Sequence, residues 1–405
     1  MSEVRQQLLI TLVHGTWPRG LFPRIVRFKH WVRALVRRQP RGPLIFWFEE
    51  GSPFLARLGT ELGDVPHKIT PLLWSGANSI FVRDKTAQVL AEHLSGEHAQ
   101  HPQATQLVIA HSHGGNIALR ALHHLKQGKA SPSCVESVNP LVVTLGTPFM
   151  EVHPADFGRR PFYIRVALTI FVMGPILFLL LGLLGWFLSL IFVPLEPLLP
   201  VLVAGTPFLV LIMGRWWVVW RAPARQNQLV ALEDATRLSG LWSTQRLLVI
   251  RAIDDEASLT LSLGAILNYL AARSIAVVLL FYLVLAFSVR TARLMGLLPW
   301  LPKWPLVFVL LGCFPLTIIL FGLLFLGRSW YGRELAVSPL ECQINIHSTP
   351  DATSPSKIVT LVRRTFARSL RHGIYDHEDC AKVIADWVRS QLTARGQEVE
   401  NRNAL

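Results

Sequence analysis

Four long apolar runs constrain the fold of this chain more than any other feature of its sequence. They occupy residues 166–193, 198–220, 274–289 and 305–327, and the first contains no charged residue. A helix needs about 20 apolar residues to cross a bilayer, a length that three of the runs provide. The third run is the shortest, and it either continues from 267–272 or only dips into the membrane. The pattern predicts two hydrophobic hairpins that span the membrane.

The composition favours a membrane location over a soluble one. Only 16% of the 405 residues are charged, and the mean hydropathy of +0.39 is too high for an ordinary water-soluble enzyme of this size. The hydrophobic content of 51% excludes intrinsic disorder. The alternative is that the runs are buried core helices, but apolar runs of this length are rare in soluble domains. We therefore expect an integral membrane protein.

The predicted hairpins divide the chain into five parts. They occupy 161–220 and 271–327, and the polar segments are 1–160, 221–270 and 328–405. Two hairpins make an even number of crossings, so the three polar segments emerge on the same side of the membrane. Their combined length suits one α/β domain. We expect the three segments to fold together.

An excess of basic residues indicates which side of the membrane the polar domain occupies. Lys and Arg number 40 against 26 Asp and Glu, which gives a formal charge of +14. Basic residues flank the polar segments and are absent from the tip of the first hairpin, which predicts a cytoplasmic domain. Three basic residues at the tip of the second hairpin argue the other way. The charge favours anionic membrane lipids as partners, whereas nucleic acid is not expected because no recognised binding module accompanies it.

Three smaller features complete the compositional picture. The first residues lack a signal-peptide pattern, so we expect the N-terminus to stay in the cytoplasm. Residues 18–42 contain eight basic residues and no acidic one, which fits either an amphipathic helix at an anionic lipid surface or a cap helix over a cleft. The cysteines lie far apart without metal-ligand spacing, which predicts neither a disulfide framework nor a zinc site; they are Cys134, Cys313, Cys342 and Cys380.

Short aliphatic and β-branched runs alternate with helix-like stretches in the polar segments. The runs are LLITLV, KITPLLW, QLVIA, PLVVTL, RLLVI and QINIH, and the helix-like stretches are 82–94, 116–126 and 381–392. This alternation predicts an α/β fold with a mostly parallel sheet and crossover helices, interrupted by the two hydrophobic hairpins. In such sheets the functional residues follow the carboxyl ends of the strands.

The residues that follow QLVIA predict a nucleophile at a sharp turn. His111-Ser112-His113-Gly114-Gly115 lies between this run and a helical pattern, so Ser112 occupies a turn between a strand and a helix. The glycines permit a tight turn, and the helix N-terminus favours negative charge near the serine. Taken alone, Ser112 is more often an ordinary turn serine, so the interpretation depends on the other motifs.

A second turn follows the run LLITLV. It contains His14-Gly15-Thr16, in which the glycine allows a backbone N–H to point at a developing oxyanion. We expect the N–H groups of Thr16 and His113 to form an oxyanion hole. His111 and His113 also have the H-x-H spacing of metal ligands, but no further Asp or His follows in the run, so zinc is not expected.

Four motifs resemble a known enzyme family. In chain order, VHGT, WSGANS with a following arginine, AHSHGG and LGTPF resemble the α/β-hydrolase fold, above all its lipase and esterase branch and the deacylases that carry LGTP. The resemblance covers the polar segments, about two thirds of the chain. It implies a serine hydrolase with a Ser-His-Asp triad, an acyl-enzyme and no metal or organic cofactor. Ala110 replaces the first glycine of the family's elbow motif, and the two leading strands of the full fold are missing, as in minimal lipases.

The resemblance also implies the other members of the triad. RLLVI precedes a loop that resembles the family's acid loop, whose register selects Asp255 and leaves Asp254 as a close alternative. His372 resembles the catalytic histidine that follows the last strand, taken as QINIH, and His377 is the alternative. In these roles Ser112 attacks, His372 accepts its proton, and Asp255 orients the imidazole.

The expected substrate is a carboxylic ester of a lipid or of another hydrophobic acyl compound, because the domain is expected at the membrane. A thioester fits the same chemistry, and the sequence leaves the oligomeric state open. A catalytically silent hydrolase fold that acts as a membrane scaffold or receptor is the alternative, although candidates for every catalytic role are present. A transporter or channel is disfavoured because no Asp or Glu lies within the four apolar runs.

Overall fold

A computed structural model describes about half of the chain. The described residues are 7–16, 45–127, 138–154, 224, 226–237, 246–252, 263, 332, 334, 342–349, 357–362 and 373–403. The four apolar runs, the basic segment 18–42 and the division into domains around them lie outside these ranges. In the part that is described, no helix combines the length and the hydropathy that a membrane crossing requires.

A six-stranded parallel sheet forms the centre of the described structure. Its strand order is β2-β1-β3-β4-β6-β8, and every neighbouring pair is parallel. The strands are β1 (Leu8–Val13), β2 (His67–Leu72), β3 (Thr105–His111), β4 (Leu141–Leu145), β6 (Leu247–Ala252) and β8 (Lys357–Leu361). The predicted α/β class is therefore confirmed for the described residues. The three central strands β1, β3 and β4 are buried along their whole length, as expected for a sheet covered on both faces.

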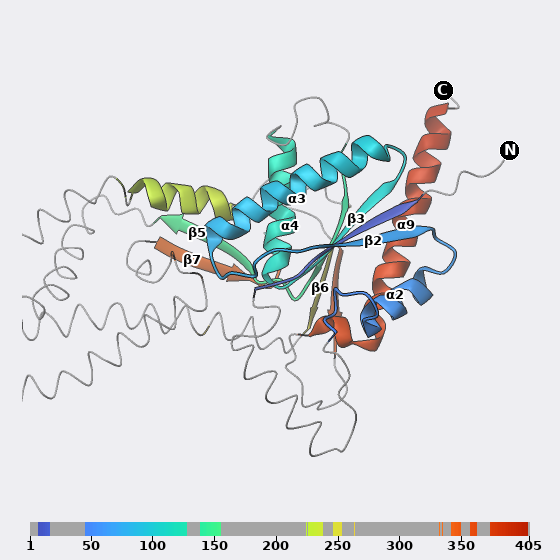
Figure 1. Cartoon of the computed structure of the whole chain (residues 1–405), viewed down its shortest axis with the longest axis horizontal. Helices are drawn as coiled ribbons and strands as arrows, with labels where there is room; N and C mark the ends of the chain where they lie inside the picture. The colour runs from blue at the N-terminus through green and yellow to red at the C-terminus, as the bar shows by residue number, and fades with distance from the viewer. Residues whose placement is uncertain are drawn as a thin grey trace, which may run out of the picture.

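Helices cover both faces of this sheet (Figure 1). On one face lie α2 (Pro53–Leu62) and α9 (Glu378–Asn403), whose apolar residues pack on alternate residues of the strands. On the other face lie α3 (Ile80–Gln100) and α4 (His113–Lys126), which pack on the residues between them. The result is a three-layer α/β/α arrangement, in which side-chain alternation along each strand supplies both cores.

Two helices begin at serines that cap them in the ordinary way. Ser52 and Ser79 have extended backbones, and their hydroxyls accept hydrogen bonds from Leu55 N–H and Val82 N–H. Pro53 occupies the first turn of α2, where its missing N–H has no cost. These caps fix where α2 and α3 begin relative to the strands before them.

A separate two-stranded ribbon corrects one prediction. The run QINIH lies in β7 (Cys342–His347), which pairs antiparallel with β5 (Phe149–Pro154) and not with the main sheet. Its Gln and Asn alternate with Ile, a pattern that suits a ribbon covered on one face. The ribbon packs on residues 226–236 and on Ile80 of α3. The prediction that QINIH is the last strand of the sheet is therefore wrong; β8 occupies that edge.

Candidate active site

Ser112 lies at the sharp turn between β3 and α4. Its backbone has φ 54° and ψ −133°, and it is the only residue other than glycine with a positive φ in the described part of the chain. Such a conformation costs about 1–3 kcal/mol and persists only where the surroundings hold it in place. The N–H of Ser112 donates to Leu145 O at 2.9 Å, which ties the turn to the end of β4. Although Ser112 is the N-cap of α4, its hydroxyl makes no capping hydrogen bond.

Glycines allow the backbone to approach this turn from both sides. A Cβ atom on Gly114 would lie 2.5 Å from Val13 O, and one on Gly115 would lie 2.0 Å from Thr147 Oγ1. Both distances are shorter than any real contact, so a side chain at 114 requires a shift of the end of β1 and one at 115 requires a shift of Thr147. Glycine is therefore required at both positions, because the N-terminus of α4 packs closely against the end of β1 and the residues after β4.

The predicted oxyanion turn lies directly beside Ser112. The ideal Cβ position of Gly15 is 2.7 Å from Ser112 Cβ and 3.2 Å from Ser112 Oγ, so the backbone of the His14-Gly15-Thr16 turn lies against the serine side chain. The structure thus brings together two motifs that are about 100 residues apart in the sequence. A side chain at position 15 would occupy space next to the hydroxyl, which explains the glycine.

His14 holds the turn in one orientation. Its Nδ1 lies 2.8 Å from Gly15 O, and because a carbonyl only accepts, this nitrogen carries the proton. A trans peptide is planar, so fixing Gly15 O directs the N–H of Thr16 to the opposite side. The buried imidazole stacks on Trp74, with ring centroids 5.4 Å apart, and contacts the tilted ring of Phe48 at 4.8 Å. Trp74 Nε1 also donates to His14 O at 2.9 Å.

The histidines on either side of Ser112 are buried in different surroundings. His111 lies between aromatic rings, with its centroid 5.9 Å from Trp47 and 5.0 Å from Tyr375. The Nδ1 of His113 lies 3.4 Å from Asn116 Nδ2, which also donates to Pro148 O at 2.8 Å. In the described residues, no group of three or more His, Cys, Asp or Glu side chains is arranged to hold a metal ion.

The predicted acid and base lie outside the described residues. Asp254 and Asp255 follow the last described residue of β6, and His372 precedes the described Gly373. The carboxyl end of β6 lies at the same edge of the parallel sheet as Ser112. Tyr375, three residues after His372, contacts His111. The chain next to the predicted base therefore contacts the residue that precedes Ser112, whereas the chain next to the predicted acid ends at the same edge of the sheet with β4 in between.

His377, the alternative base, has a structural position. Its Nδ1 accepts a hydrogen bond from Asp379 N–H at 3.2 Å, and its Nε2 lies 3.4 Å from Val362 O. With Nε2 protonated, the ring caps the first turn of α9 and contacts the end of β8. Both ring nitrogens are thus engaged, which favours His372 over His377 as the candidate base.

The WSGANS motif directly precedes α3, and its arginine lies in the first turn of that helix. Arg83 is buried, and its Nη1 donates to Asn78 Oδ1 at 2.9 Å. Burial lowers the pKa of Arg83 to about 10, opposed by the charge of Glu334, so the guanidinium stays charged at neutral pH. Glu334 accepts hydrogen bonds from Ser79 Oγ and from Ile80 N–H. The motif therefore joins α3 to a residue that follows the second apolar pair.

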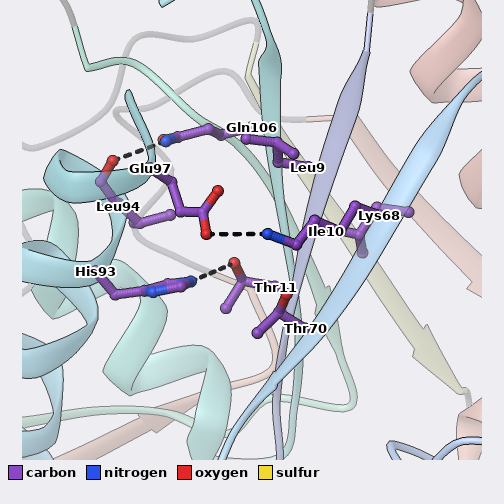
Figure 2. A pocket seen from close by; sticks show the side chains of 9 residues that line it. All are labelled: Leu9, Ile10, Thr11, Lys68, Thr70, His93, Leu94, Glu97 and Gln106. Atoms are coloured by element: carbon purple, nitrogen blue, oxygen red, sulfur yellow. Dashed lines mark hydrogen bonds and ion pairs between the residues drawn. The ribbon is translucent and has the colours of Figure 1, made fainter. Parts of the chain in front are cut away.

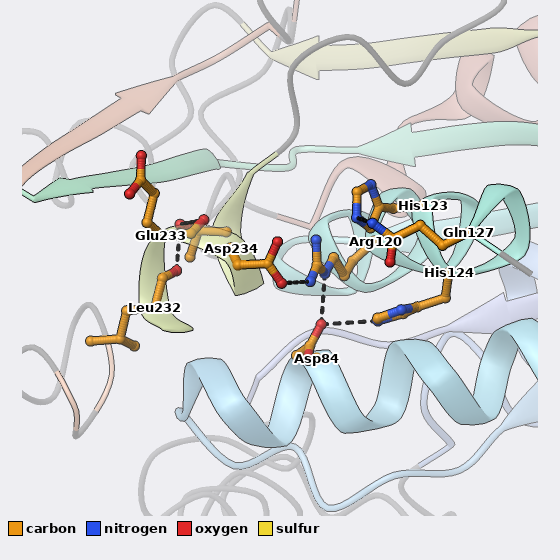
Figure 3. Close-up of polar contacts among 9 residues, drawn as sticks. Asp84, Arg120, His123, His124, Gln127, Leu232, Glu233 and Asp234 are labelled. Carbon is orange, nitrogen blue, oxygen red and sulfur yellow. Dashed lines mark hydrogen bonds and ion pairs between the residues drawn. The ribbon is translucent and has the colours of Figure 1, made fainter. Parts of the chain in front are cut away.

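An ion-pair network fastens α3 to α4 (Figure 3). Buried Arg120 donates to Asp84 at 2.6 Å and to Asp234 at 2.8 Å, and His124 Nε2 lies 3.0 Å from Asp84. Burial tends to raise the pKa of Asp84, but the hydrogen bonds and charges of His124 and Arg120 outweigh it and hold the pKa below its ordinary value. The network fixes the helix that follows Ser112 against its neighbour.

A small cavity lies between β1, β2 and α3 (Figure 2). Its volume is about 10 Å³, near the minimum that holds one water molecule. Polar pairs surround it: Lys68 with Glu97 at 3.6 Å, and Gln106 Nε2 with Leu94 O at 2.7 Å. Ser112 does not line this cavity, whose volume is too small for an acyl substrate.

The sequence did not indicate the aromatic and arginine residues around the serine turn. Trp47, Phe48, Arg57 and Tyr375 all contact the turn or the residues that support it. The cluster Phe46-Trp47-Phe48 was the one available signal, because three consecutive aromatic residues outside an apolar run indicate a packed loop. Nothing in the sequence connects this cluster with residue 375.

Comparisons with known proteins give no relative for this chain. No protein-family model, no curated protein and no solved structure matches it. The candidate site is therefore assigned from its residues and geometry alone.

Proposed function

We propose that this chain is a membrane-bound serine hydrolase of the α/β-hydrolase type, which cleaves carboxylic esters of lipids or other hydrophobic acyl compounds. The backbone of Ser112 is the observation that carries the proposal. A serine held at positive φ between a parallel strand and a helix, with its hydroxyl not used for capping, is the arrangement that a nucleophile requires. An ordinary capping serine would stabilise α4 without this backbone strain, so the strain at Ser112 has no structural purpose.

The proposed reaction proceeds through an acyl-enzyme. His372 accepts the proton of the Ser112 hydroxyl as its oxygen attacks the ester carbonyl, and Asp255 holds the imidazole in the required tautomer. The N–H groups of Thr16 and His113 stabilise the tetrahedral oxyanion. His372 then returns the proton to the leaving alcohol, and water hydrolyses the acyl-enzyme by the same steps in reverse. The hydrogen bond from His14 to Gly15 O supports this assignment, because it fixes the peptide that carries the Thr16 N–H.

The proposed substrate class and location rest on the apolar runs of the sequence. Spans at 161–220 and 271–327 would hold the domain at the cytoplasmic face, among anionic lipids. Each exposed CH₂ group costs about 0.8 kcal/mol in water, so a site near the headgroups favours long acyl chains over short ones. The same domain without hydrolase activity would be a scaffold or receptor, and the experiment below separates the two.

Labelling with a fluorophosphonate probe tests the proposal. Wild-type protein in native membranes should be labelled at Ser112, and Ser112→Ala should lose labelling together with ester hydrolysis while it stays folded. Ser79→Ala is the matched control, because Ser79 also precedes a helix but caps it; this variant should label normally. Hydrolysis of a panel of p-nitrophenyl esters should increase with acyl length. An unlabelled wild type that cleaves no ester would instead indicate the scaffold.

A further inference from the structure

The 3-10 turn η3 (Ile374–Asp376) lies against the residue that precedes Ser112. The ring of Tyr375 stacks on Trp47, with centroids 5.4 Å apart and planes 16° apart, and forms a T-shaped pair with His111 whose centroids are 5.0 Å apart. Ile374 is buried in the core beneath α2 and α9. The C-terminal segment is thus in contact with the serine turn at a defined point.

Arg57 of α2 binds the backbone of the same turn. Its Nη2 donates to Tyr375 O at 3.0 Å, and its Nη1 lies 3.4 Å from Asp376 O. These carbonyls belong to the end of a short helical turn, where backbone acceptors need partners from elsewhere. The planar guanidinium can serve both at once, which an ammonium group on a flexible chain does less well.

Trp47 and Arg57 belong to one rigid unit. The carbonyl of Trp47 accepts a hydrogen bond from Ser52 Oγ at 2.7 Å, and the same hydroxyl caps α2 by accepting from Leu55 N–H. Trp47 itself is buried and meets Phe54 of α2 edge to face. Segment 45–62 therefore contacts η3 at two points, through the ring of Trp47 and through the guanidinium of Arg57.

We infer that Arg57 is a positioning residue: through η3 it sets the place of the C-terminal segment, and with it the base, relative to Ser112. This inference rests on the proposed function. A base that moves by about 1 Å from its working position loses rate by about 100-fold, because proton transfer depends on geometry. The hydrogen bonds of Arg57 go to the backbone of η3, so we expect its loss to lower kcat and to leave KM nearly unchanged.

Tyr375 takes part in this arrangement through its ring and its backbone carbonyl, and its hydroxyl does not titrate in the working pH range. Burial raises the pKa of the Tyr375 hydroxyl to about 12, with a smaller contribution from Asp376, so the phenol stays neutral over the working range. Changes at Arg57 should therefore lower the plateau of the pH profile without adding a new titration to it.

Arg389 provides a matched control. It extends from α9 and donates to Glu61 O near the end of α2, so it also joins α2 to the C-terminal part of the chain through a backbone carbonyl. It lies on α9 and away from η3, and it pairs with Asp386 of its own helix. If arginine-to-carbonyl contacts matter only for stability, the two arginines should behave alike.

The test compares Arg57→Ala, Arg57→Lys and Arg389→Ala in the full-length protein, by melting temperature, by the rate constant of fluorophosphonate labelling and by kcat and KM. We expect Arg57→Ala to lower the labelling rate and kcat by about 10–100-fold with KM within about twofold. Arg57→Lys should recover part of this loss and remain at least about fivefold below wild type. Arg389→Ala should keep the wild-type labelling rate.

Two results would overturn the inference. The first is a wild-type labelling rate in folded Arg57→Ala or, where that variant does not fold, in Arg57→Lys. The second is an equal loss of rate in Arg57→Ala and Arg389→Ala. Either result, with the wild type labelled at Ser112, removes the role of Arg57 and leaves the proposed function intact. A wild type that is not labelled and cleaves no ester removes the proposed function itself.

Discussion

Ser79 and Ser112 occupy equivalent places and are built in opposite ways. Each follows a strand of the parallel sheet and directly precedes a helix. Ser79 has an extended backbone (φ −148°, ψ 129°), and its hydroxyl caps α3 through Val82 N–H. Ser112 has a strained backbone (φ 54°, ψ −133°), and its hydroxyl makes no cap. One serine stabilises its helix, whereas the other is held in a costly conformation that leaves its hydroxyl available.

The neighbours of the two serines account for this difference. Glu334 lies at the start of α3 and accepts from Ser79 Oγ and Ile80 N–H, so donors at that helix end are satisfied. At Ser112 the surrounding backbone approaches through Gly15 and Gly114 instead. The comparison teaches that the context of a helix N-terminus, and not the serine itself, indicates whether the residue has a chemical role. Four predictions test it, beginning with the largest effect.

The largest effect should come from the predicted acid. An acid that fixes the tautomer of the base has no counterpart at Ser79, so Asp255→Asn should lower kcat by up to about 10⁴-fold. Asp254→Asn should lower kcat much less. Steady-state kinetics on a long-chain ester measure both. The reverse ranking would move the acid by one residue, and full activity in His372→Ala would transfer the role of base to His377.

The next effect should come from the glycines that surround Ser112. Gly114→Ala places a methyl group 2.5 Å from Val13 O, so we expect a loss of about 2–3 kcal/mol in the free energy of unfolding. Activity should fall as well, because the strand end beside the oxyanion turn must shift. Gly96→Ala is the control, since nothing lies within 4 Å of its ideal Cβ position. Equal stability of the two variants would show that the turn is not tightly packed.

Substitutions at the two serines should change stability in opposite directions. Ser112→Gly relieves the positive φ and should raise the free energy of unfolding by about 1 kcal/mol while abolishing activity. Ser79→Ala removes a cap and should lower it by about 1 kcal/mol while activity persists. Chemical unfolding of the detergent-solubilised protein measures both. A loss of stability in Ser112→Gly would contradict the interpretation of the turn as strained.

The smallest effect at neutral pH concerns the network between α3 and α4. The pKa of Asp84 is lowered in the folded state, so its contribution to stability is present above the unfolded pKa of about 4 and is lost as pH falls through the lower folded value. Wild-type melting temperature should therefore fall below about pH 4, and Asp84→Asn should show a shallower fall. Parallel acid titrations of both proteins, followed by circular dichroism, provide the measurement. If the melting temperatures of both proteins fell equally below about pH 4, other carboxylates would account for the loss of stability in acid.

Part of this structure could be predicted from the sequence because buried parallel strands appear as continuous apolar runs. LLITLV, QLVIA, PLVVTL and RLLVI correspond to β1, β3, β4 and β6, and KITPLLW to β2. The strand β8 was missed because KIVTL is short, partly exposed and mixed in polarity, as edge strands often are. The elbow around Ser112 was predictable since its glycines are local to it. The contact between Arg57 and Tyr375 was not, because it joins residues 318 positions apart.

The order of the strands has a consequence for how the chain can fold. The strands β2, β1, β3 and β4 come from residues 8–145 and can assemble early, with the serine turn already formed. Pairing of β6 with β4 and β8 brings together residues more than 100 positions apart, such as Arg246 with Asn139 and Arg251 with Thr360. Each of these pairings encloses one of the predicted hairpins, and contacts this distant form slowly. During synthesis, β2, β1, β3 and β4 would thus form a partial sheet that already contains Ser112. The strands β6 and β8 would pair with it only after the apolar segments that precede them had been synthesised. The proposed triad would be complete only after the last strand had joined the sheet, so the nascent chain would not yet hydrolyse esters.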